Sequence, residues 1–266
     1  MGNEVTDKPF CKKPGFIVLL VFLAVFIIYY SIMALLAPVG KMNEFDAEYG
    51  FRQDKKNTID EKILSDSAYL KLLKEKVFLQ SKIAMAETDS IYLTINLADS
   101  SVNLEISGVV VHSTEIKKIS ISKILRKGHA YTILNMLSKP LIIAKDFTSI
   151  KKEPLMIKMA PRDTSEYQPD IIPDTADFEP VNFILEMQNG VKVHVYQDEK
   201  LRFGDGIRRF GFDLWDRITN TASSMIRVFT LKVPEYHPYI KMRLARADAK
   251  IIYRAIPYNG QVGVYR

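Results

Sequence analysis

The feature that most constrains this chain is an uncharged apolar run near its N-terminus. Residues 16–37 read FIVLLVFLAVFIIYYSIMALLA and contain no charged side chain. A helix of this length rises about 33 Å, which is enough to cross a hydrocarbon core of about 30 Å. The run therefore predicts a single transmembrane helix.

A cleaved signal peptide is the main alternative for this run. Signal peptides have a shorter apolar region of roughly 7–15 residues, and their cleavage site follows a small-x-small pattern. Here Leu35-Leu36-Ala37 places a large residue where a small one is required, and Pro38 follows directly. We therefore expect the segment to remain in the protein as an uncleaved signal anchor.

Lysines close to the span predict its orientation. Lys8, Lys12 and Lys13 lie just before the run, whereas Lys41 beyond it is soon followed by acidic side chains. The positive-inside rule then places residues 1–15 in the cytoplasm as a short tail. The predicted location is a single pass through the cytoplasmic (inner) membrane, with the C-terminal body in the periplasm or another extracytoplasmic space.

The composition of the body narrows the classes of partner. The chain has 266 residues, of which 47% are hydrophobic, and this is enough for one sizeable domain with an appendage. A net charge of +6 would allow nucleic acid, an anionic membrane or an acidic polymer as partner. An extracytoplasmic location disfavours nucleic acid. The only cysteine is Cys11, which fits an oxidising compartment without disulfide bonds.

Helical periodicity follows the span. Residues 38–58 are mixed and polar and are predicted to be a linker, and residues 59–86 are predicted to form a juxtamembrane amphipathic helix. A capping box at Thr58 and Glu61 marks the start of this helix. Its apolar residues recur at helical spacing: Ile59, Ile63, Leu70, Leu73, Val77 and Ile83. The helix is either a short coiled-coil stalk, which would allow self-association, or a helix packed on the domain.

From residue 91 the apolar period changes to two, which is typical of strands. The alternation over residues 91–106 predicts a hairpin with one buried face. A second hairpin is predicted around Asn189-Gly190 with a type I′ turn, and this places His194 on a strand. An apolar helical face recurs over residues 207–229. The body is therefore predicted to be mostly β, with one or two helices.

The C-terminal stretch has the layout of a catalytic loop that runs into a helix and a last strand. Tyr236–Met242 reads YHPYIKM, and Asp248-Ala249 and Gly260-Gln261-Val262 follow. This layout resembles the end of the L,D-transpeptidase (YkuD-like) catalytic domain, whose motif is Ser-His-Gly-Cys-hydrophobic-Arg-hydrophobic. Val193-His194-Val195 is similar to the Ile-His-Gly strand of that family. The resemblance implies a β-sandwich or open barrel over residues 91–266, in a family that remodels peptidoglycan by acyl transfer through a cysteine.

This chain departs from the family motif at the positions that carry the chemistry. Tyr236 stands at the serine, Pro238 at the glycine, Tyr239 at the cysteine and Lys241 at the arginine. A phenol has a pKa of ~10 against ~8.5 for a thiol and is bulkier, so Tyr239 is a poor nucleophile. Pro238 lacks the backbone N–H that an oxyanion hole would use, and Lys241 loses the planar fork of arginine.

No catalytic residue is therefore expected, and the resemblance implies a pseudoenzyme. The degenerate motif positions are His194, Tyr236, His237, Pro238, Tyr239 and Lys241. The candidate binding residues are His194, His237, Tyr239, Lys241 and Arg243. No spacing of histidine, cysteine or acidic residues matches a metal-ligand pattern, so neither a metal nor a cofactor is expected.

The expected function is a membrane-anchored module for maintenance of the cell wall or envelope. It would bind peptidoglycan or position a cell-wall enzyme, in part through a basic surface that begins at Lys241 and Arg243. Two alternatives stay open. One is a divergent peptidoglycan-processing transpeptidase or carboxypeptidase that uses His194 and His237 with a water molecule. The other is a structural subunit of an envelope complex.

Overall fold

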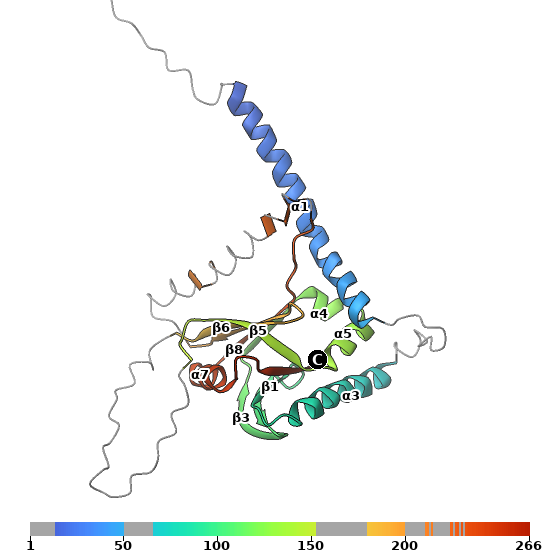
Figure 1. Ribbon diagram of the computed structural model, residues 1–266, viewed down its shortest axis with the longest axis vertical. Helices are drawn as coiled ribbons and strands as arrows, with labels where there is room; N and C mark the ends of the chain where they lie inside the picture. Colours follow the sequence, from blue (N-terminus) through green and yellow to red (C-terminus); the bar gives the residue numbers. More distant parts are fainter. Residues whose placement is uncertain are drawn as a thin grey trace, which may run out of the picture. The chain divides into compact units, whose positions relative to one another are not determined.

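A computed structural model describes most of the chain (Figure 1). The described residues are 14–50, 66–152, 180–199, 211, 212, 214, 224, 225, 227, 228, 230 and 232–266. The chain divides into two compact units, Met1–Glu44 with Asp216–Tyr236, and Phe45–Trp215 with His237–Arg266. Residues 160–180, which their proline and aspartate content predicts to be a surface loop, lie outside the described residues except for Pro180, and so does most of the predicted helix at residues 207–229.

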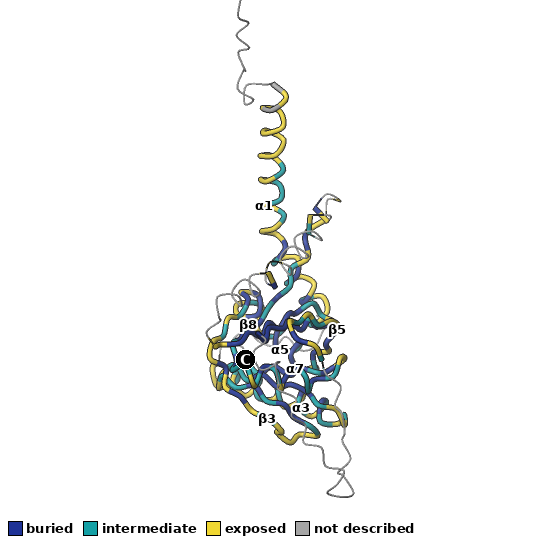
Figure 2. Tube along the Cα trace, turned by 90° about the vertical axis from the view of Figure 1, so that its left-hand side faces the viewer, coloured by how far each residue is buried: buried dark blue, intermediate teal, exposed yellow. Residues whose placement is uncertain are grey.

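Helix α1 (Pro14–Tyr49) carries the predicted membrane span. Over the described residues it is the one helix long and apolar enough to cross a membrane, and no part of its apolar window is buried inside the protein. Figure 2 accordingly colours most of α1 as exposed. Lipid is a favourable environment for such a surface, because every backbone group of a helix is bonded within the helix.

α1 continues past the predicted boundary at residue 38. Pro38 lies inside the helix, and residues 39–49, predicted as part of the linker, are helical. Two kinds of contact support this extension. Lys41 and Glu44 form an ion pair at 2.7 Å, one helical turn apart. Phe45 is fully buried, so the end of the helix is held by tertiary packing that a linker would lack.

The second unit is built on a mixed sheet of nine strands. The strands are β1 Tyr92–Asn96, β2 Ser101–Ile106, β3 Val109–Glu115, β4 Lys118–Ile121, β5 Leu141–Thr148, β6 Asn182–Met187, β7 Lys192–Gln197, β8 Tyr239–Leu244 and β9 Gln261–Tyr265. Their order is β3-β2-β1-β9-β5-β6-β7-β8-β4. The pairs β1·β9 and β7·β8 are parallel, and the other pairs are antiparallel.

The ends of this sheet must lie close together. β3 and β4 are the first and last strands of the order, yet only Ile116 and Lys117 separate them in the chain. Three peptide units join Glu115 to Lys118 and span at most about 11 Å, so the sheet curls until its two edges approach each other there. β5 joins the two halves, because its first residues pair with β9 and the rest with β6. The prediction of an apolar helix followed by a domain built on a β sheet with helices is confirmed, and the L,D-transpeptidase-like sandwich or open barrel stays a prediction.

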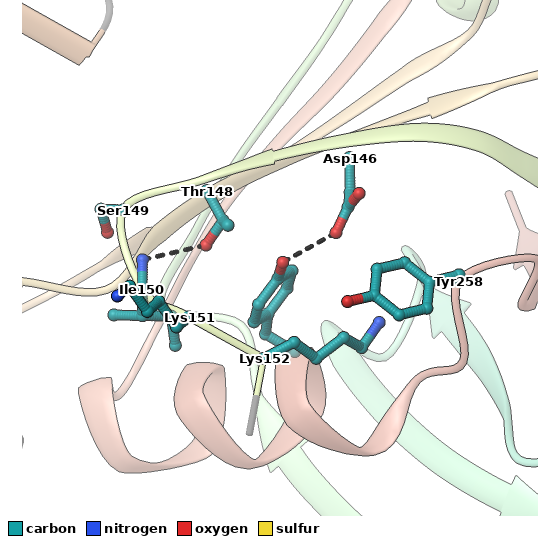
Figure 3. Close-up of a pocket in the computed structure, with 8 residues that line it drawn as sticks. Asp146, Thr148, Ser149, Ile150, Lys151, Lys152 and Tyr258 are labelled. Carbon is teal, nitrogen blue, oxygen red and sulfur yellow. Dashed lines mark hydrogen bonds between the residues drawn. The ribbon is translucent and has the colours of Figure 1, made fainter. Parts of the chain in front are cut away.

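Among the described residues, four helices of the second unit accompany the sheet: α3 Ser67–Ala86, α4 Lys123–Lys127, α5 Ala130–Leu137 and α7 Arg246–Ala255. Three of these lie within residues 91–266, where one or two were predicted. α4 and α5 are short, and so their sequences show no long periodic signal. On α7, the Tyr253 ring packs against Phe183 of β6 at 5.2 Å between centroids. The Tyr253 hydroxyl donates a hydrogen bond to Asp146 of β5 at 2.7 Å (Figure 3).

α3 packs on the domain. It buries Val77, Ser81 and Met85, and it contacts β9 and α5. Gly263 of β9 allows the close approach, because a Cβ atom there would lie 2.5 Å from Met85 Cε. Ile83, which was expected on the buried face, is 60% exposed. Asp66 caps the observed helix by accepting a hydrogen bond from the N–H of Ala68, and self-association through α3 stays a prediction.

Both predicted hairpins are present, but the turn between β6 and β7 differs from the prediction. A type I′ turn needs positive φ at both central residues, and of Asn189 and Gly190 only Gly190 has it, at 81°. The N–H of Gly190 donates to the carbonyl of Met187, and the N–H of Met187 donates to the carbonyl of Val191. These bonds define a three-residue loop with a left-handed glycine, while Ser107-Gly108 between β2 and β3 has positive φ at both positions.

Candidate functional site

β7 and β8 bring the motif residues onto one face of the sheet. The two strands are parallel, and the register pairs Lys192 with Tyr239 and His194 with Lys241. Side chains alternate between the faces of a strand, so paired residues point the same way. The face shared by these pairs carries Lys192, His194, Tyr196, Tyr239, Lys241 and Arg243. The opposite face carries the buried Val193, Val195, Ile240 and Met242 of the core.

The rings of His194 and Tyr239 are neighbours on this face. Their centroids are 6.2 Å apart and their planes are nearly perpendicular, at 84°. The Lys241 ammonium lies over the Tyr239 ring at 4.9 Å from its centroid. The structure thus brings together His194, which resembles the histidine of the family's Ile-His-Gly strand, and Tyr239 and Lys241, which stand at the cysteine and arginine of the motif.

The imidazole of His194 is directed at a different tyrosine for hydrogen bonding. Its Nδ1 lies 3.3 Å from the Tyr196 hydroxyl, and the two rings stack at 6.1 Å. No hydrogen bond joins the side chains of His194 and Tyr239. A base that activates a nucleophile has to lie within hydrogen-bond reach of it. The His194–Tyr239 pair is therefore a ring contact and not a base–nucleophile hydrogen bond.

His194 is buried beside an aromatic cluster. It is 5% exposed and its ring stacks on Tyr196, which packs with Ile184 and Phe212 in a buried cluster. The Phe212 ring also stacks on Phe147 of β5 at 4.6 Å. Among the described residues, the surroundings of His194 are therefore largely aromatic packing.

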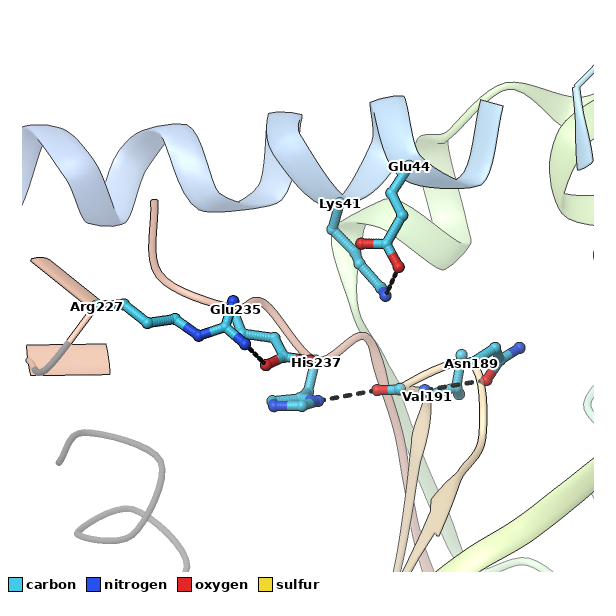
Figure 4. A network of polar contacts seen from close by, with 8 residues as sticks. Lys41, Glu44, Asn189, Val191, Arg227, Glu235 and His237 are labelled. Carbon is cyan, nitrogen blue, oxygen red and sulfur yellow. Dashed lines mark hydrogen bonds and ion pairs between the residues drawn. The ribbon is translucent and has the colours of Figure 1, made fainter. Parts of the chain in front are cut away.

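His237 and Pro238 hold the start of β8 against the β6–β7 turn. His237 Nδ1 lies 3.1 Å from the carbonyl oxygen of Gly190, and Figure 4 shows the imidazole directed toward that turn. The N–H of Lys192 donates to the carbonyl of Pro238 at 2.8 Å. Tyr236 belongs to the first unit. These contacts give His237 a structural partner and leave its role in binding as a prediction.

Arg243 lies farther along β8 and is partly neutralised. Its Nη1 is 3.9 Å from Asp198, and both side chains are partly exposed. The antiparallel register with β4 places Lys118 beside Arg243. Lys118, Lys241 and Arg243 form a set that we call the basic stripe. The stripe keeps a net positive charge after the Asp198 contact.

Sequence reasoning missed one polar cluster that includes the Asp248 of the motif. Asp248 Oδ1 lies 3.1 Å from His112 Nε2, and Oδ2 accepts a hydrogen bond from the Thr114 hydroxyl at 2.6 Å. Asp248 stands in the first turn of α7, where a negative charge favours the helix dipole. The cluster ties β3 to α7. More than 100 residues separate its partners in the chain, so no local sequence pattern predicts the cluster.

Metal binding has no support from the geometry. Over the residues that the structure describes, no group of three or more histidine, cysteine or acidic side chains could hold an ion. His194 Nδ1 lies 3.3 Å from the Tyr196 hydroxyl and His237 Nδ1 lies 3.1 Å from the Gly190 carbonyl oxygen.

Comparison with known proteins gives no relative for this chain. No family model, no curated protein and no solved structure matches it. The relationship to the L,D-transpeptidases stays a prediction from the motif residues.

Proposed function

We propose that this chain is a membrane-anchored, non-catalytic relative of the L,D-transpeptidases that binds peptidoglycan or positions a cell-wall enzyme. The observation that carries the proposal is the ring contact between His194 and Tyr239, at 6.2 Å between centroids. A tyrosine stands beside a strand histidine where the family has a cysteine beside a histidine. The neighbouring Lys241 occupies the motif position of the family's arginine and lies over the same ring.

The loss of the thiol accounts for the packing around the histidine. An active site has to admit substrate, whereas His194 is 5% exposed and stacks on Tyr196, which packs with Ile184 and Phe212. Aromatic rings in a closed cluster stabilise the fold through buried area and favourable ring geometry. We therefore assign the cluster to stability, and we place ligand recognition on the exposed part of the same sheet.

The basic stripe is the surface that would bind peptidoglycan. Lys118 is exposed, and Lys241 and Arg243 are partly exposed. Peptidoglycan stem peptides carry carboxylates, and a basic surface attracts such a polymer in a salt-dependent way. A surface of this kind would keep the domain on the wall while α1 holds it in the membrane.

The full chain in mild detergent is expected to co-sediment with purified peptidoglycan sacculi. The double variant Lys241→Gln/Arg243→Gln should be retained several-fold less, and salt at about 0.5 M should release the protein, because screening shortens the reach of each charge. The matched control is Lys71→Gln/Lys76→Gln on α3, which removes the same charge from exposed positions elsewhere. Equal retention of both double variants, or no retention at all, would contradict recognition of the wall by the stripe.

The proposed location is the cytoplasmic membrane, with the N-terminus inside the cell. Cys11 precedes the span and is the only thiol in the chain. We expect a membrane-impermeant maleimide to leave Cys11 unlabelled on intact cells and to label it fully after lysis. A cysteine introduced at the exposed Ser113 of β3 should show the reverse pattern in cells whose outer envelope admits the reagent. Labelling of Cys11 on intact cells would invert the topology and remove the domain from the wall.

A further inference from the structure

A cavity of about 480 Å³ lies apart from the motif strands (Figure 3). It lies between the end of β5, helix α7 and the segment that follows α7. The lining residues are Asp146, Thr148, Ser149, Ile150, Lys151, Lys152, Tyr253 and Tyr258. None of these residues is a degenerate motif position or a candidate binding residue, so the cavity has to be explained separately.

The side chain of Lys152 crosses this cavity between two aromatic rings. Its ammonium lies 4.5 Å from the centroid of Tyr258 and 5.1 Å from the centroid of Tyr253. Figure 3 shows the lysine side chain reaching toward Tyr258. Two cation–π contacts hold the ammonium in place.

The ammonium of Lys152 has no polar partner there. It forms no hydrogen bond and no ion pair with any residue that the structure describes. Burial lowers the pKa of Lys152, and the nearby Asp146 carboxylate offsets only part of this effect. A partly desolvated ammonium with three unused donors is a group that an anion would stabilise.

Asp146 restricts which anions fit. One of its carboxylate oxygens accepts the hydrogen bond from Tyr253. Burial and this carboxylate raise the pKa of the Tyr253 phenol, so the phenol stays a neutral donor. The carboxylate repels a simple anion, but it can accept a hydrogen bond from a donor next to the anionic group. The ligand should therefore combine an acid with an adjacent N–H or O–H.

We propose that this cavity binds a small ligand in which a carboxylate adjoins a hydrogen-bond donor. Lys152 holds the carboxylate, Asp146 accepts from the donor, and Tyr253 and Tyr258 cover the faces of the ligand. Two sources share this chemistry: the C-terminal residue of a peptide, whose donor is the amide N–H, and a sugar acid, whose donors are hydroxyls. The proposal does not depend on the proposed function, because none of its residues lies on β7 or β8.

Lys152 reactivity provides the test. In the full chain in mild detergent, an amine-acetylating reagent at pH 7.5 should modify Lys152 faster than the exposed Lys151, because a lowered pKa leaves more of the neutral, reactive amine. N-acetylalanine and glucuronate are the two probes. At ten times its dissociation constant, a bound probe should slow acetylation of Lys152 about tenfold and leave Lys151 unchanged. Peptide mass spectrometry reads both sites in one sample.

The controls separate charge from shape. N-acetylalaninamide lacks the carboxylate and propionate lacks the donor, so both should protect Lys152 much less. Tyr258→Ala, at a residue that is 68% exposed, should weaken protection several-fold without unfolding the domain. Protection by N-acetylalanine alone identifies a peptide terminus, and protection by glucuronate alone identifies a sugar acid; either result supports the site. Equal protection by the amide, or no protection by either probe at 100 mM, would overturn it.

Discussion

Replacement of Glu105 by alanine is expected to lower the free energy of unfolding by about 3 kcal/mol. Glu105 is 1% exposed and accepts three charge-assisted contacts. The Thr94 hydroxyl donates to Oε1 at 2.7 Å, and the Tyr92 hydroxyl donates to Oε2 at 3.2 Å. The Lys82 ammonium of α3 lies 2.9 Å from Oε2. Alanine would leave these groups without their acceptor.

The size of the expected loss depends on whether each partner of Glu105 can form hydrogen bonds with water once the carboxylate is removed. Removal of one member of a fully buried ion pair costs roughly 3–5 kcal/mol. Lys82 is 28% exposed and can turn to solvent, which reduces that cost. Tyr92 and Thr94 are 1% exposed and cannot turn to solvent. Burial, together with the Glu105 charge, raises the pKa of Tyr92, so the phenol stays protonated and needs an acceptor.

Urea unfolding of the full chain in mild detergent, followed by circular dichroism, measures this change. Glu105→Gln keeps the shape and one acceptor oxygen, so its loss should be smaller than that of Glu105→Ala. The matched control is Glu115→Ala, where an exposed glutamate pairs with Lys117 and the expected change is within about 0.5 kcal/mol. A loss below about 1 kcal/mol for Glu105→Ala would show that water replaces its contacts.

The Glu105 cluster also marks a limit of the sequence reasoning. Alternation over residues 91–106 correctly predicts the hairpin of β1 and β2, with Leu93, Ile95, Val102 and Leu104 buried. It also predicts a single buried face, and this part is wrong. Tyr92, Thr94 and Glu105 are buried as well, because Lys82 of α3 reaches Glu105 from outside the hairpin. A period of two describes one strand and carries no information about a helix that covers it.

Local sequence patterns likewise predict the wrong end for α1. A proline such as Pro38 is normally taken as the end of a helix, because proline removes one backbone hydrogen bond and strains the preceding turn. Here the helix continues to Tyr49, where Asn135 donates a hydrogen bond to the Tyr49 carbonyl and Thr132 donates to Asp46. The partners lie 86 residues away in the chain. Tertiary contacts of this kind override a local breaker and leave no local trace.

The candidate sites also combine features that the sequence predicts with features that it does not. The motif resemblance grouped His194, Tyr239 and Lys241, and the parallel pairing of β7 with β8 places them together. The closed aromatic cluster was not predictable, because Phe212 comes from a different segment. The Lys152 cavity was not predictable either. Its lysine and its two tyrosines are about 100 residues apart, and each alone looks like an ordinary surface residue.

Exchange of Tyr239 for cysteine, in a chain whose Cys11 is replaced by serine, is expected to give a thiol with a pKa about two units below the ordinary ~8.5. Two neighbours favour the thiolate. His194 adjoins the position, and the Lys241 ammonium lies over the ring that the thiol would replace. A nearby positive charge lowers the pKa of an acid by roughly 1–3 units. Burial has the opposite effect, but Tyr239 is only partly buried, so its contribution is smaller.

Alkylation by iodoacetamide across pH 5–10, read by mass spectrometry, gives the pKa of this single thiol. Addition of His194→Ala to the cysteine variant should raise the thiol pKa most of the way back to ~8.5, and addition of Lys241→Met should raise it part of the way. Each change removes one favourable neighbour of the thiolate. The cysteine variant itself tests the ancestry that the motif implies, since only a residue held in the geometry of a former nucleophile should gain reactivity from both neighbours. A thiol pKa at or above 8.5 with His194 and Lys241 in place would mean that Tyr239 occupies an ordinary packed position, and the proposed relationship to cysteine transpeptidases would fail.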